Sequence, residues 1–288
     1  VEDTVTGVTA GVAAGATVVG YSPSSVGHSS PEALRAAGAV QVIADMARKL
    51  GLGQKFPMPY PSQSYGTVPD AAWKMKKYGQ EWQVYDTVNA TIGQGYMLIN
   101  PLQLAIMAAR LASGRQLSPN LIFGKKSSAA APLGVSQEHL DIIHAAMRDV
   151  VNGGGTGGGA RISAPEILMA GKTGTAQVRR ITMAERAGGV RSNASLAFKL
   201  RDHALFQGFA PADNPRYAIG TIIEHGGHVN IIQDAPRISG DVMSYLFDRA
   251  GALERLAKYE AEWGGDPITR QKKQMDAYRA AHGMTPSP

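Results

Sequence analysis

The sequence predicts an α/β (α+β) fold in which helices flank an antiparallel sheet. Three apolar segments have the length and composition of strands, and the turn sequence Asp213-Asn214-Pro215-Arg216 joins the last two into a hairpin. Helical segments with start and stop signals lie on both sides of these strands in the chain. The predicted strands are residues 166–179, 204–210 and 216–224.

The first part of the chain contains one predicted helix between two irregular regions. Residues 1–30 contain mainly Gly, Ala, Ser, Thr and Val without clear periodicity, and we expect poor order there. Ser30 can cap a helix that begins at Pro31, and Gly51 ends it. Residues 52–91 are rich in Pro, Tyr, Ser and Gly, which predicts a long structured loop.

Two further helices have clear signals at both ends. Asn100-Pro101 begins a helix that stops near Gly114, and Ser136 caps another that ends at Gly153. Both carry apolar residues at helical spacing, so each is expected to pack one face against the sheet.

The second half of the chain predicts an insertion, a covering helix and a tail. Residues 181–202 form a long polar insertion between the first two strands, and a helix at 235–247 covers one face of the sheet. Phe206 and Phe209 are expected in the core. Residues 251–288 predict a charged segment that is helical at first and then becomes a loose tail.

Composition indicates a globular chain with a substantial core. The 288 residues are 44% hydrophobic and 18% charged, enough for one large domain or two small ones. The net charge is +6, but the basic residues are dispersed, so we expect no nucleic-acid partner. The absence of cysteine excludes a thiolate nucleophile, a disulfide scaffold and Cys-ligated zinc.

The segment Lys172-Thr173-Gly174-Thr175 is the most informative part of the chain. It lies within the first predicted strand, where a lysine is unexpected unless a polar group docks there. Lys172 offers an ammonium group to an anion, and Thr173 and Thr175 offer hydroxyls. Gly174 removes a side chain, so an extended substrate can lie against the backbone. The simpler alternative is a surface strand with an ordinary exposed lysine, because threonine favours strands anyway.

A phosphate-binding loop is a second alternative for the same residues. Gly171-Lys172-Thr173 matches the end of G-x-x-x-x-G-K-[ST], but Glu166 occupies the place of the first glycine. A carboxylate repels phosphate, which disfavours an NTPase. A dinucleotide site is also disfavoured, because Gly153-x-Gly155-x-x-Gly158 follows a predicted helix rather than a strand.

The order of several segments along the chain supports the substrate-strand interpretation. Residues 40–263 closely resemble the C-terminal half of the transpeptidase domain of class B penicillin-binding proteins, nearest to the penicillin-binding protein 2 group of rod-shape elongation. K-T-G is a motif of penicillin-binding proteins. The other segments that carry the resemblance are Ile92-Gly93-Gln94-Gly95-Tyr96, Val150-Val151-Asn152-Gly153-Gly154-Gly155-Thr156-Gly157 and His203-Ala204-Leu205-Phe206-Gln207-Gly208-Phe209-Ala210-Pro211.

The resemblance implies a peptidoglycan D,D-transpeptidase, which acylates a serine with the D-Ala-D-Ala end of a stem peptide and binds β-lactams. It implies that Lys172, Thr173, Gly174 and Thr175 bind the substrate, and that the Thr175 N–H helps to hold the oxyanion. It implies no cofactor and no metal. It also implies the periplasmic face of the bacterial inner membrane, an anchor outside this chain, and a membrane glycan polymerase of the elongation machinery as partner.

The nucleophile motif of this family is missing from the chain. In S-x-x-K the lysine takes the serine proton, but no lysine here has a serine three residues before it. Thr269-Arg270-Gln271-Lys272 is the nearest imitation. Ser118-Pro119-Asn120 has the letters of the family's S-x-N motif, but it falls too late in the chain. We therefore expect an incomplete fold without its first strands and serine helix, inactive by itself, from a natural fragment or a truncated or frame-shifted reading.

The alternative function is a non-catalytic remnant that binds stem peptide or a partner, and an NTPase is the less favoured third. The expected organisation has three parts. Residues 1–40 are an atypical low-complexity start, residues 41–250 the C-terminal part of a transpeptidase domain, and residues 251–288 a charged helical tail.

The histidines do not predict a metal site. His225 and His228 are three residues apart on an expected turn, and no third ligand lies near them in the sequence. A turn that closes the last strand is the better interpretation. His203 lies beside Asp202 at the start of a strand, where an ordinary polar contact is expected.

Overall fold

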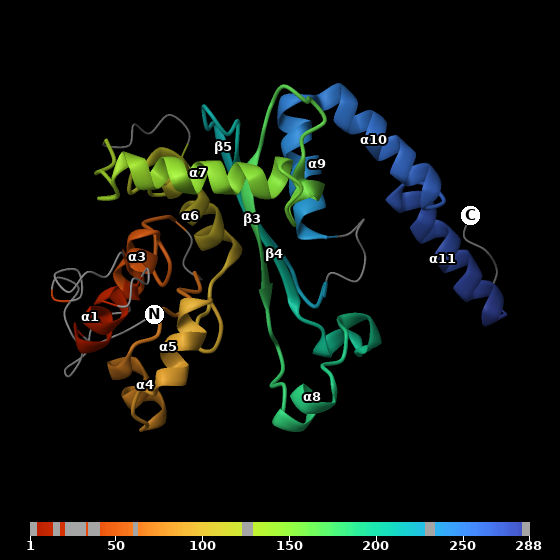
Figure 1. Ribbon diagram of the computed structural model, residues 1–288. Coiled ribbons are helices and arrows are strands. Elements are labelled where there is room, and N and C mark those ends of the chain that lie inside the picture. The colour runs from red at the N-terminus through yellow and green to blue at the C-terminus, as the bar shows by residue number, and fades with distance from the viewer. Residues whose placement is uncertain are drawn as a thin grey trace.

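The computed structural model describes residues 5–13, 18–20, 33, 41–59, 63–122, 129–227 and 234–283. Its centre is a three-stranded sheet in the order β3-β4-β5, with both neighbouring pairs antiparallel (Figure 1). The predicted fold class and the β4–β5 hairpin are therefore confirmed. The strands are β3 (Ala170–Ala176), β4 (His203–Ala210) and β5 (Tyr217–Ile223). The first strand is thus shorter than predicted at both ends.

One face of the sheet packs against α9 (Ala235–Phe247), whose bounds match the predicted helix. Phe206 on β4 is fully buried there with Met243 of α9. Phe209, also fully buried, belongs to a second cluster with Met147. Both phenylalanines are core residues, as the sequence predicts.

The other face is partly covered by α6 (Pro101–Ser113), which contacts β5 and β4. Gly220 allows this close packing, because a Cβ there would lie 2.6 Å from the Ala105 nitrogen. Asn100 caps the helix by accepting a hydrogen bond from the Gln103 N–H, and Gly114 ends it with a positive φ of 63°. Both predicted ends are confirmed.

The helix α7 (Gln137–Asn152) passes across one end of the sheet (Figure 1). Ser136 caps it by accepting a hydrogen bond from the His139 N–H, and it stops before Gly153, as predicted. The glycine-rich connection to β3 contains a short 3₁₀ turn, η1 (Gly158–Ala160).

The N-terminal part differs from the prediction. The helix α1 (Val5–Ala13) lies where poor order was expected, and its Val8 is fully buried, so tertiary packing overrides the weak local pattern. β1 (Val19–Gly20) pairs in parallel with β2 (Gln41–Val42). The predicted helix from residue 31 to 51 is interrupted by β2, and α3 (Ile43–Lys49) forms its last part. Ala33 is also helical, and residues 34–40 lie outside the described residues. The proposed cap residues, 30 and 31, lie outside the described residues.

The predicted long loop at 52–91 is wrong in its second half, where two short helices form. They are α4 (Ala71–Tyr78) and α5 (Val84–Thr91). Asp70 caps α4, and a buried ion pair between Lys74 and Asp86 ties the two helices together at 2.6 Å. The residues around these helices are rich in Pro, Tyr and Gly, so composition indicated a loop and not the two helices.

The polar insertion folds into short helices. They are α8 (Met183–Gly188), η2 (Asn193–Ser195) and η3 (Phe198–Leu200). At the C-terminus, α10 (Arg249–Glu262) is followed by α11 (Pro267–Ala281), so the predicted loose tail is wrong as far as Ala281. Asp266 explains the second helix, because its side chain accepts hydrogen bonds from the Ile268 and Thr269 N–H groups.

Candidate functional site on strand β3

The segment Lys172-Thr173-Gly174-Thr175 lies in the middle of β3, a terminal strand of the sheet. Lys172 is directly opposite Gln207, so these two side chains share one face. Thr173 is opposite Phe206 and shares the other face. The Cβ atoms of Lys172 and of the two threonines thus lie on opposite faces of an edge strand, and the long lysine side chain reaches around the edge to the Thr173 hydroxyl.

Lys172 has no carboxylate partner among the described residues. Its Nζ donates to the Thr173 carbonyl oxygen at 3.0 Å and lies 3.4 Å from the Thr173 hydroxyl. That hydroxyl lies 2.7 Å from the Thr156 hydroxyl, on the glycine-rich connection. The ammonium therefore rests on its own strand and is available to an incoming anionic group.

The two glycines of the segment differ in what they do. At Gly171 a Cβ would collide with the Phe206 ring and lie 2.9 Å from the Gln207 carbonyl oxygen, so core packing excludes a side chain. At Gly174 a Cβ would meet the Leu205 Cβ at 3.4 Å, an ordinary contact. Packing does not demand glycine at 174, which is consistent with its expected role in the approach of a ligand.

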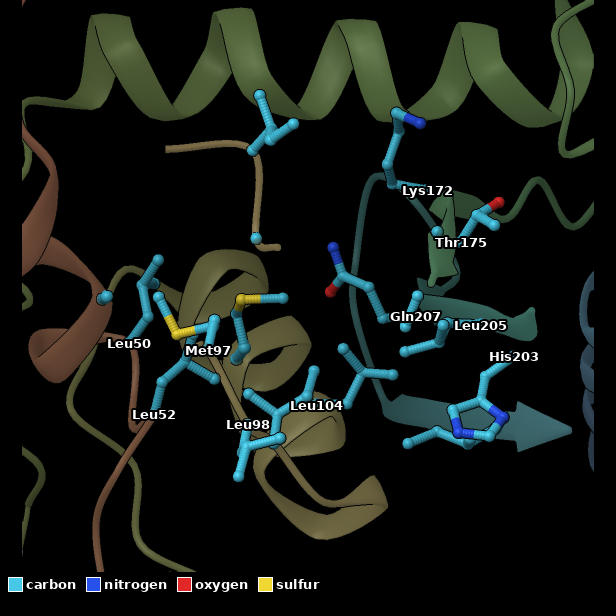
Figure 2. Close-up of a pocket in the computed structure, with 18 of the residues that line it drawn as sticks. Leu50, Leu52, Met97, Leu98, Leu104, Lys172, Thr175, His203, Leu205 and Gln207 are labelled. Carbon is cyan, nitrogen blue, oxygen red and sulfur yellow. The ribbon is translucent and has the colours of Figure 1, made fainter. Parts of the chain in front are cut away.

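A cavity of about 470 Å³ lies beside this strand, between β3–β4 on one side and α3 and α6 on the other (Figure 2). Its walls are mainly apolar and include Leu50, Leu52 and Leu104 opposite Leu205. The volume is in the range of small-molecule sites, which are also mainly apolar with a few polar groups. All four residues of the predicted site line it.

Gln207 is a polar residue of this cavity that the sequence analysis missed. It is only 8% exposed, and its side chain extends from β4 toward the space in front of α6 (Figure 2). Its Oε1 has no hydrogen-bond donor among the described residues. Such a buried acceptor is uncommon. The sequence signal that could have identified Gln207 is an amide residue directly after the apolar residues Leu205 and Phe206 of a predicted strand.

Two other amide side chains contact the backbone of β3, and sequence reasoning missed both roles. Gln94 donates from Nε2 to the Thr175 carbonyl oxygen at 2.6 Å, and its Oε1 accepts from the Gln177 N–H at 3.3 Å. Asn152, the last residue of α7, donates from Nδ2 to the Met169 carbonyl oxygen at 2.9 Å. Both belong to segments that carry the family resemblance.

The remaining candidate residues lie elsewhere. Gly171-Lys172-Thr173 is part of a strand and does not open a helix. The His203 Nδ1 accepts a hydrogen bond from the His225 N–H at 2.9 Å, which is the expected strand-end contact. Within the described ranges, no three side chains form a metal-binding group, and His228 lies outside those ranges. No helix in that part of the chain is long and apolar enough to cross a membrane.

Comparison with known proteins identifies the family to which this strand and cavity belong. The family model described as the penicillin binding protein transpeptidase domain matches residues 34–244. The chain belongs to the penicillin-binding protein transpeptidase family. The matched region contains the whole sheet and the cavity beside it.

Most of the related curated proteins are peptidoglycan D,D-transpeptidases named MrdA. Peptidoglycan D,D-transpeptidase MrdA of Acinetobacter baumannii is 37% identical over 194 residues, which cover 63% of this chain and 28% of that protein. MrdA of Salmonella typhimurium is 28% identical over 219 residues, which cover 72% of this chain and 34% of that protein. The chain therefore spans about a third or less of the curated relatives it matches.

Solved structures show the same relationship. Penicillin-binding protein 2 of Helicobacter pylori, solved in complex with MreC, superposes with a TM-score of 0.59 at 27% identity, covering 77% of this chain and 37% of that one. Pseudomonas aeruginosa PBP2, in complex with WCK 5153, gives a TM-score of 0.53 at 30% identity, covering 77% and 45%. The resemblance read from the sequence to class B penicillin-binding protein 2 is thus confirmed.

Proposed function

We propose that the chain is part of a peptidoglycan D,D-transpeptidase of the penicillin-binding protein 2 type, which cross-links stem peptides through a serine acyl-enzyme and binds penicillin. The observation that carries this proposal is the edge strand β3 beside a cavity of about 470 Å³. Its Lys172 has no carboxylate partner among the described residues. Family membership and the names of the MrdA relatives support it.

Each residue of the strand has a role in the proposed site. Lys172 attracts the substrate carboxylate, and Thr173 and Thr175 donate hydrogen bonds to that carboxylate and to the acyl carbonyl. Gly174 permits close backbone approach. The Thr175 N–H holds the negative charge that develops on the carbonyl oxygen of the tetrahedral intermediate.

The chain by itself is proposed to bind substrate without performing the chemistry. An acyl-enzyme requires a serine with a base that takes its proton, and no lysine of this sequence follows a serine at the S-x-x-K spacing. A binding strand without a nucleophile retains affinity for a D-Ala-D-Ala end but forms no covalent adduct. The chain by itself would therefore bind the stem peptide without cross-linking it.

The extent of the domain, the cellular location and the partner are inferred from the relatives. We propose that residues 41–250 are the C-terminal part of the transpeptidase domain, 1–40 an atypical start and 251–288 a helical tail. The family match at 34–244 supports the central part. The complete protein would act on the periplasmic face of the inner membrane with a glycan polymerase as partner, in cell-wall synthesis that determines cell shape.

Penicillin and a stem-peptide analogue test the proposal together. The purified chain is incubated with benzylpenicillin for intact-mass analysis, and with a peptide ending in D-Ala-D-Ala for calorimetry. We expect no adduct, and peptide binding that Lys172→Ala weakens about tenfold by loss of one charge-assisted hydrogen bond. Lys76→Ala, which removes an exposed lysine on α4, is the matched control.

Two results would contradict the proposal. A covalent adduct on the parent chain would show that another serine completes the site, so the chain would be an enzyme by itself. No peptide binding by the folded chain, or equal loss in both lysine variants, would remove the assigned role of Lys172.

A further inference from the structure

Two histidines from different elements meet where the polar insertion returns to the sheet. His203 is the first residue of β4, and His225 lies on the turn that follows β5. The centroids of the two rings are 4.8 Å apart, and the Phe198 ring of η3 lies 5.3 Å from the His225 ring. The end of the insertion, the start of β4 and the β5 turn therefore share one small cluster of rings.

Hydrogen bonds determine which nitrogen of each ring carries a proton. The His225 backbone N–H donates to the His203 Nδ1 at 2.9 Å, so this nitrogen is unprotonated and neutral His203 carries its proton on Nε2. The His225 Nδ1 lies 3.1 Å from the Arg201 carbonyl oxygen, which can only accept, so this nitrogen donates. A second proton on His225 would bind at Nε2 and leave both bonds intact. Only a proton on the His203 Nδ1 removes one of them.

These two bonds hold the end of the insertion on the β5 turn. A third bond joins the same two segments, because the Gly227 N–H donates to the Asp202 carbonyl oxygen at 2.9 Å. The backbone φ of His225 is +57°, a conformation that is uncommon for a residue with a side chain. The turn therefore depends on the contacts that surround it.

His203 also forms part of the wall of the candidate site. Its side chain lines the cavity beside β3, and alternation along β4 places it on the same face as Leu205 and Gln207 (Figure 2). In the register of the sheet it is opposite Ala176, the residue directly after Thr175. A change in the position of His203 therefore changes the wall of the cavity.

The charged side chains around the two rings do not neutralise an imidazolium in this arrangement. Those on the elements that meet here are Lys172 on β3, Lys199, Arg201 and Asp202 in the insertion, and Glu224 on the turn after β5. The Asp202 carboxylate already accepts from the Asn193 Nδ2 at 3.1 Å. Within the described ranges, neither imidazole forms an ion pair. A proton on the His203 Nδ1 therefore removes a hydrogen bond without gaining a carboxylate contact.

We propose that His203 and His225 form a pH-sensitive latch, defined as the two hydrogen bonds of His225 to His203 and to Arg201. The latch is closed while the His203 Nδ1 is unprotonated. Histidine side chains change charge between about pH 5 and 8, and a proton on this nitrogen replaces the acceptor with a donor that faces the His225 N–H. That bond is then lost, and residues 198–202 lose an anchor at the point where His203 lines the cavity.

Amide hydrogen exchange measured by NMR at about pH 7.5 and pH 5 tests the latch without any ligand. Protection factors are compared, because they correct for the intrinsic effect of pH on exchange. The protection factor of the His225 N–H should fall by about tenfold at the lower pH, as expected for the loss of one hydrogen bond. That of the Leu133 N–H, which bonds to the Gly114 carbonyl oxygen, should not change. Equal protection of His225 at both pH values, or an equal loss at Leu133, would overturn the proposal.

A variant separates the titrating proton from the rest of the cluster. In His203→Asn, the shorter side chain can place an oxygen close to the position of Nδ1, but it does not titrate. The protection factor of the His225 N–H should then be the same at both pH values. His139→Asn, which replaces an exposed histidine on α7, is the matched control and should keep the response of the parent chain. A response that persists in His203→Asn would show that another group is responsible.

The ¹⁵N shifts of the His203 ring in the parent chain provide a test that needs no variant. Protonation of Nδ1 and the loss of His225 protection should have the same midpoint along a pH series. Two different midpoints would contradict the latch. Because none of these measurements involves a peptide or a β-lactam, failure of the proposed binding function would leave their outcome unchanged.

Discussion

Glu185 shows how a single side chain anchors the insertion between β3 and β4. Both carboxylate oxygens lie 2.7 Å from guanidinium nitrogens of Arg179, and the Arg191 N–H donates to one of them. The hydrogen bonds from Arg179, and secondarily that from Arg191, lower the pKa of Glu185 from 4.5 to about 2. The charged form is therefore the one that holds α8 in place.

The pH dependence follows from that direction. Because the pKa of this carboxyl is lower in the folded chain, its contribution to stability is present above pH 4.5 and is lost as the pH falls through about 2. We expect the ¹³C shift of the Glu185 carboxyl to titrate with a midpoint near 2. In Arg179→Ala the midpoint should move up toward 4.5. A midpoint near 4.5 in the parent chain would show that the pair does not form in solution.

The residues of the site differ in how far sequence could reveal them. The sequence alone identifies the segment Lys172-Thr173-Gly174-Thr175, because its residues are contiguous and form a recognisable motif. Gln94, Asn152 and Gln207 acquire their positions only when distant segments meet on β3. Their amide chemistry is ordinary on a surface, and no local pattern distinguishes them from other Gln and Asn residues.

At the scale of elements, the buried pair between α4 and α5 is the contact with the largest expected effect. Lys74 is 1% exposed, and its Nζ lies 2.6 Å from the Asp86 carboxylate. Burial lowers the pKa of Lys74, but the hydrogen bond and charge of Asp86 outweigh it, so the net pKa is raised. Asp86 also accepts from the Gln83 N–H in a capping box.

Removing Asp86 should therefore destabilise the chain strongly. Asp86→Ala leaves a buried ammonium group without its partner, and we expect a loss of about 3–5 kcal/mol in the free energy of unfolding. Asp70→Ala is the matched control, because Asp70 caps α4 but pairs with the more exposed Arg48. That variant should lose about 1 kcal/mol. Urea unfolding followed by circular dichroism measures both, and equal losses would contradict the special role of the buried pair.

Helices were predictable where their end signals are complete. Asn100 and Gly114 delimit α6, and Ser136 with Gly153 delimits α7, so local capping chemistry determines these bounds. The helix α4 also has both end signals, Asp70 and Gly79, but it has only eight residues, and its contact with α5 stabilises both helices. A short helix that is stabilised by packing against another helix is difficult to recognise from its own segment of the sequence.

For the whole molecule, the C-terminal helices divide into an attached and a peripheral part. The helix α10 contacts α9, and its Tyr259 hydroxyl accepts from the Arg237 guanidinium at 2.6 Å. Neither helix has a buried residue, so the division rests on the contact between α10 and α9. The sheet core is therefore expected to depend on the first of these helices and not on the second.

Two truncations test this division. Ending the chain at Gly265 removes α11 and should change the melting temperature by less than about 2 °C, because little apolar surface becomes exposed. Ending it at Asp248 also removes α10 and should lower the melting temperature by about 5 °C or more. Scanning calorimetry measures both. A large decrease from the shorter deletion would show that α11 packs on the core.

The position of β3 at the edge of the sheet also affects how separate copies of the chain behave. A free sheet edge is a template on which strands of other molecules assemble, and proteins reduce that risk by shortening or covering the edge. Here the carboxamides of Gln94 and Asn152 donate to the Thr175 and Met169 carbonyl oxygens, so side chains from distant segments already occupy two positions on this strand. A strand from a second copy would have to displace both amides before it could pair along the whole of β3.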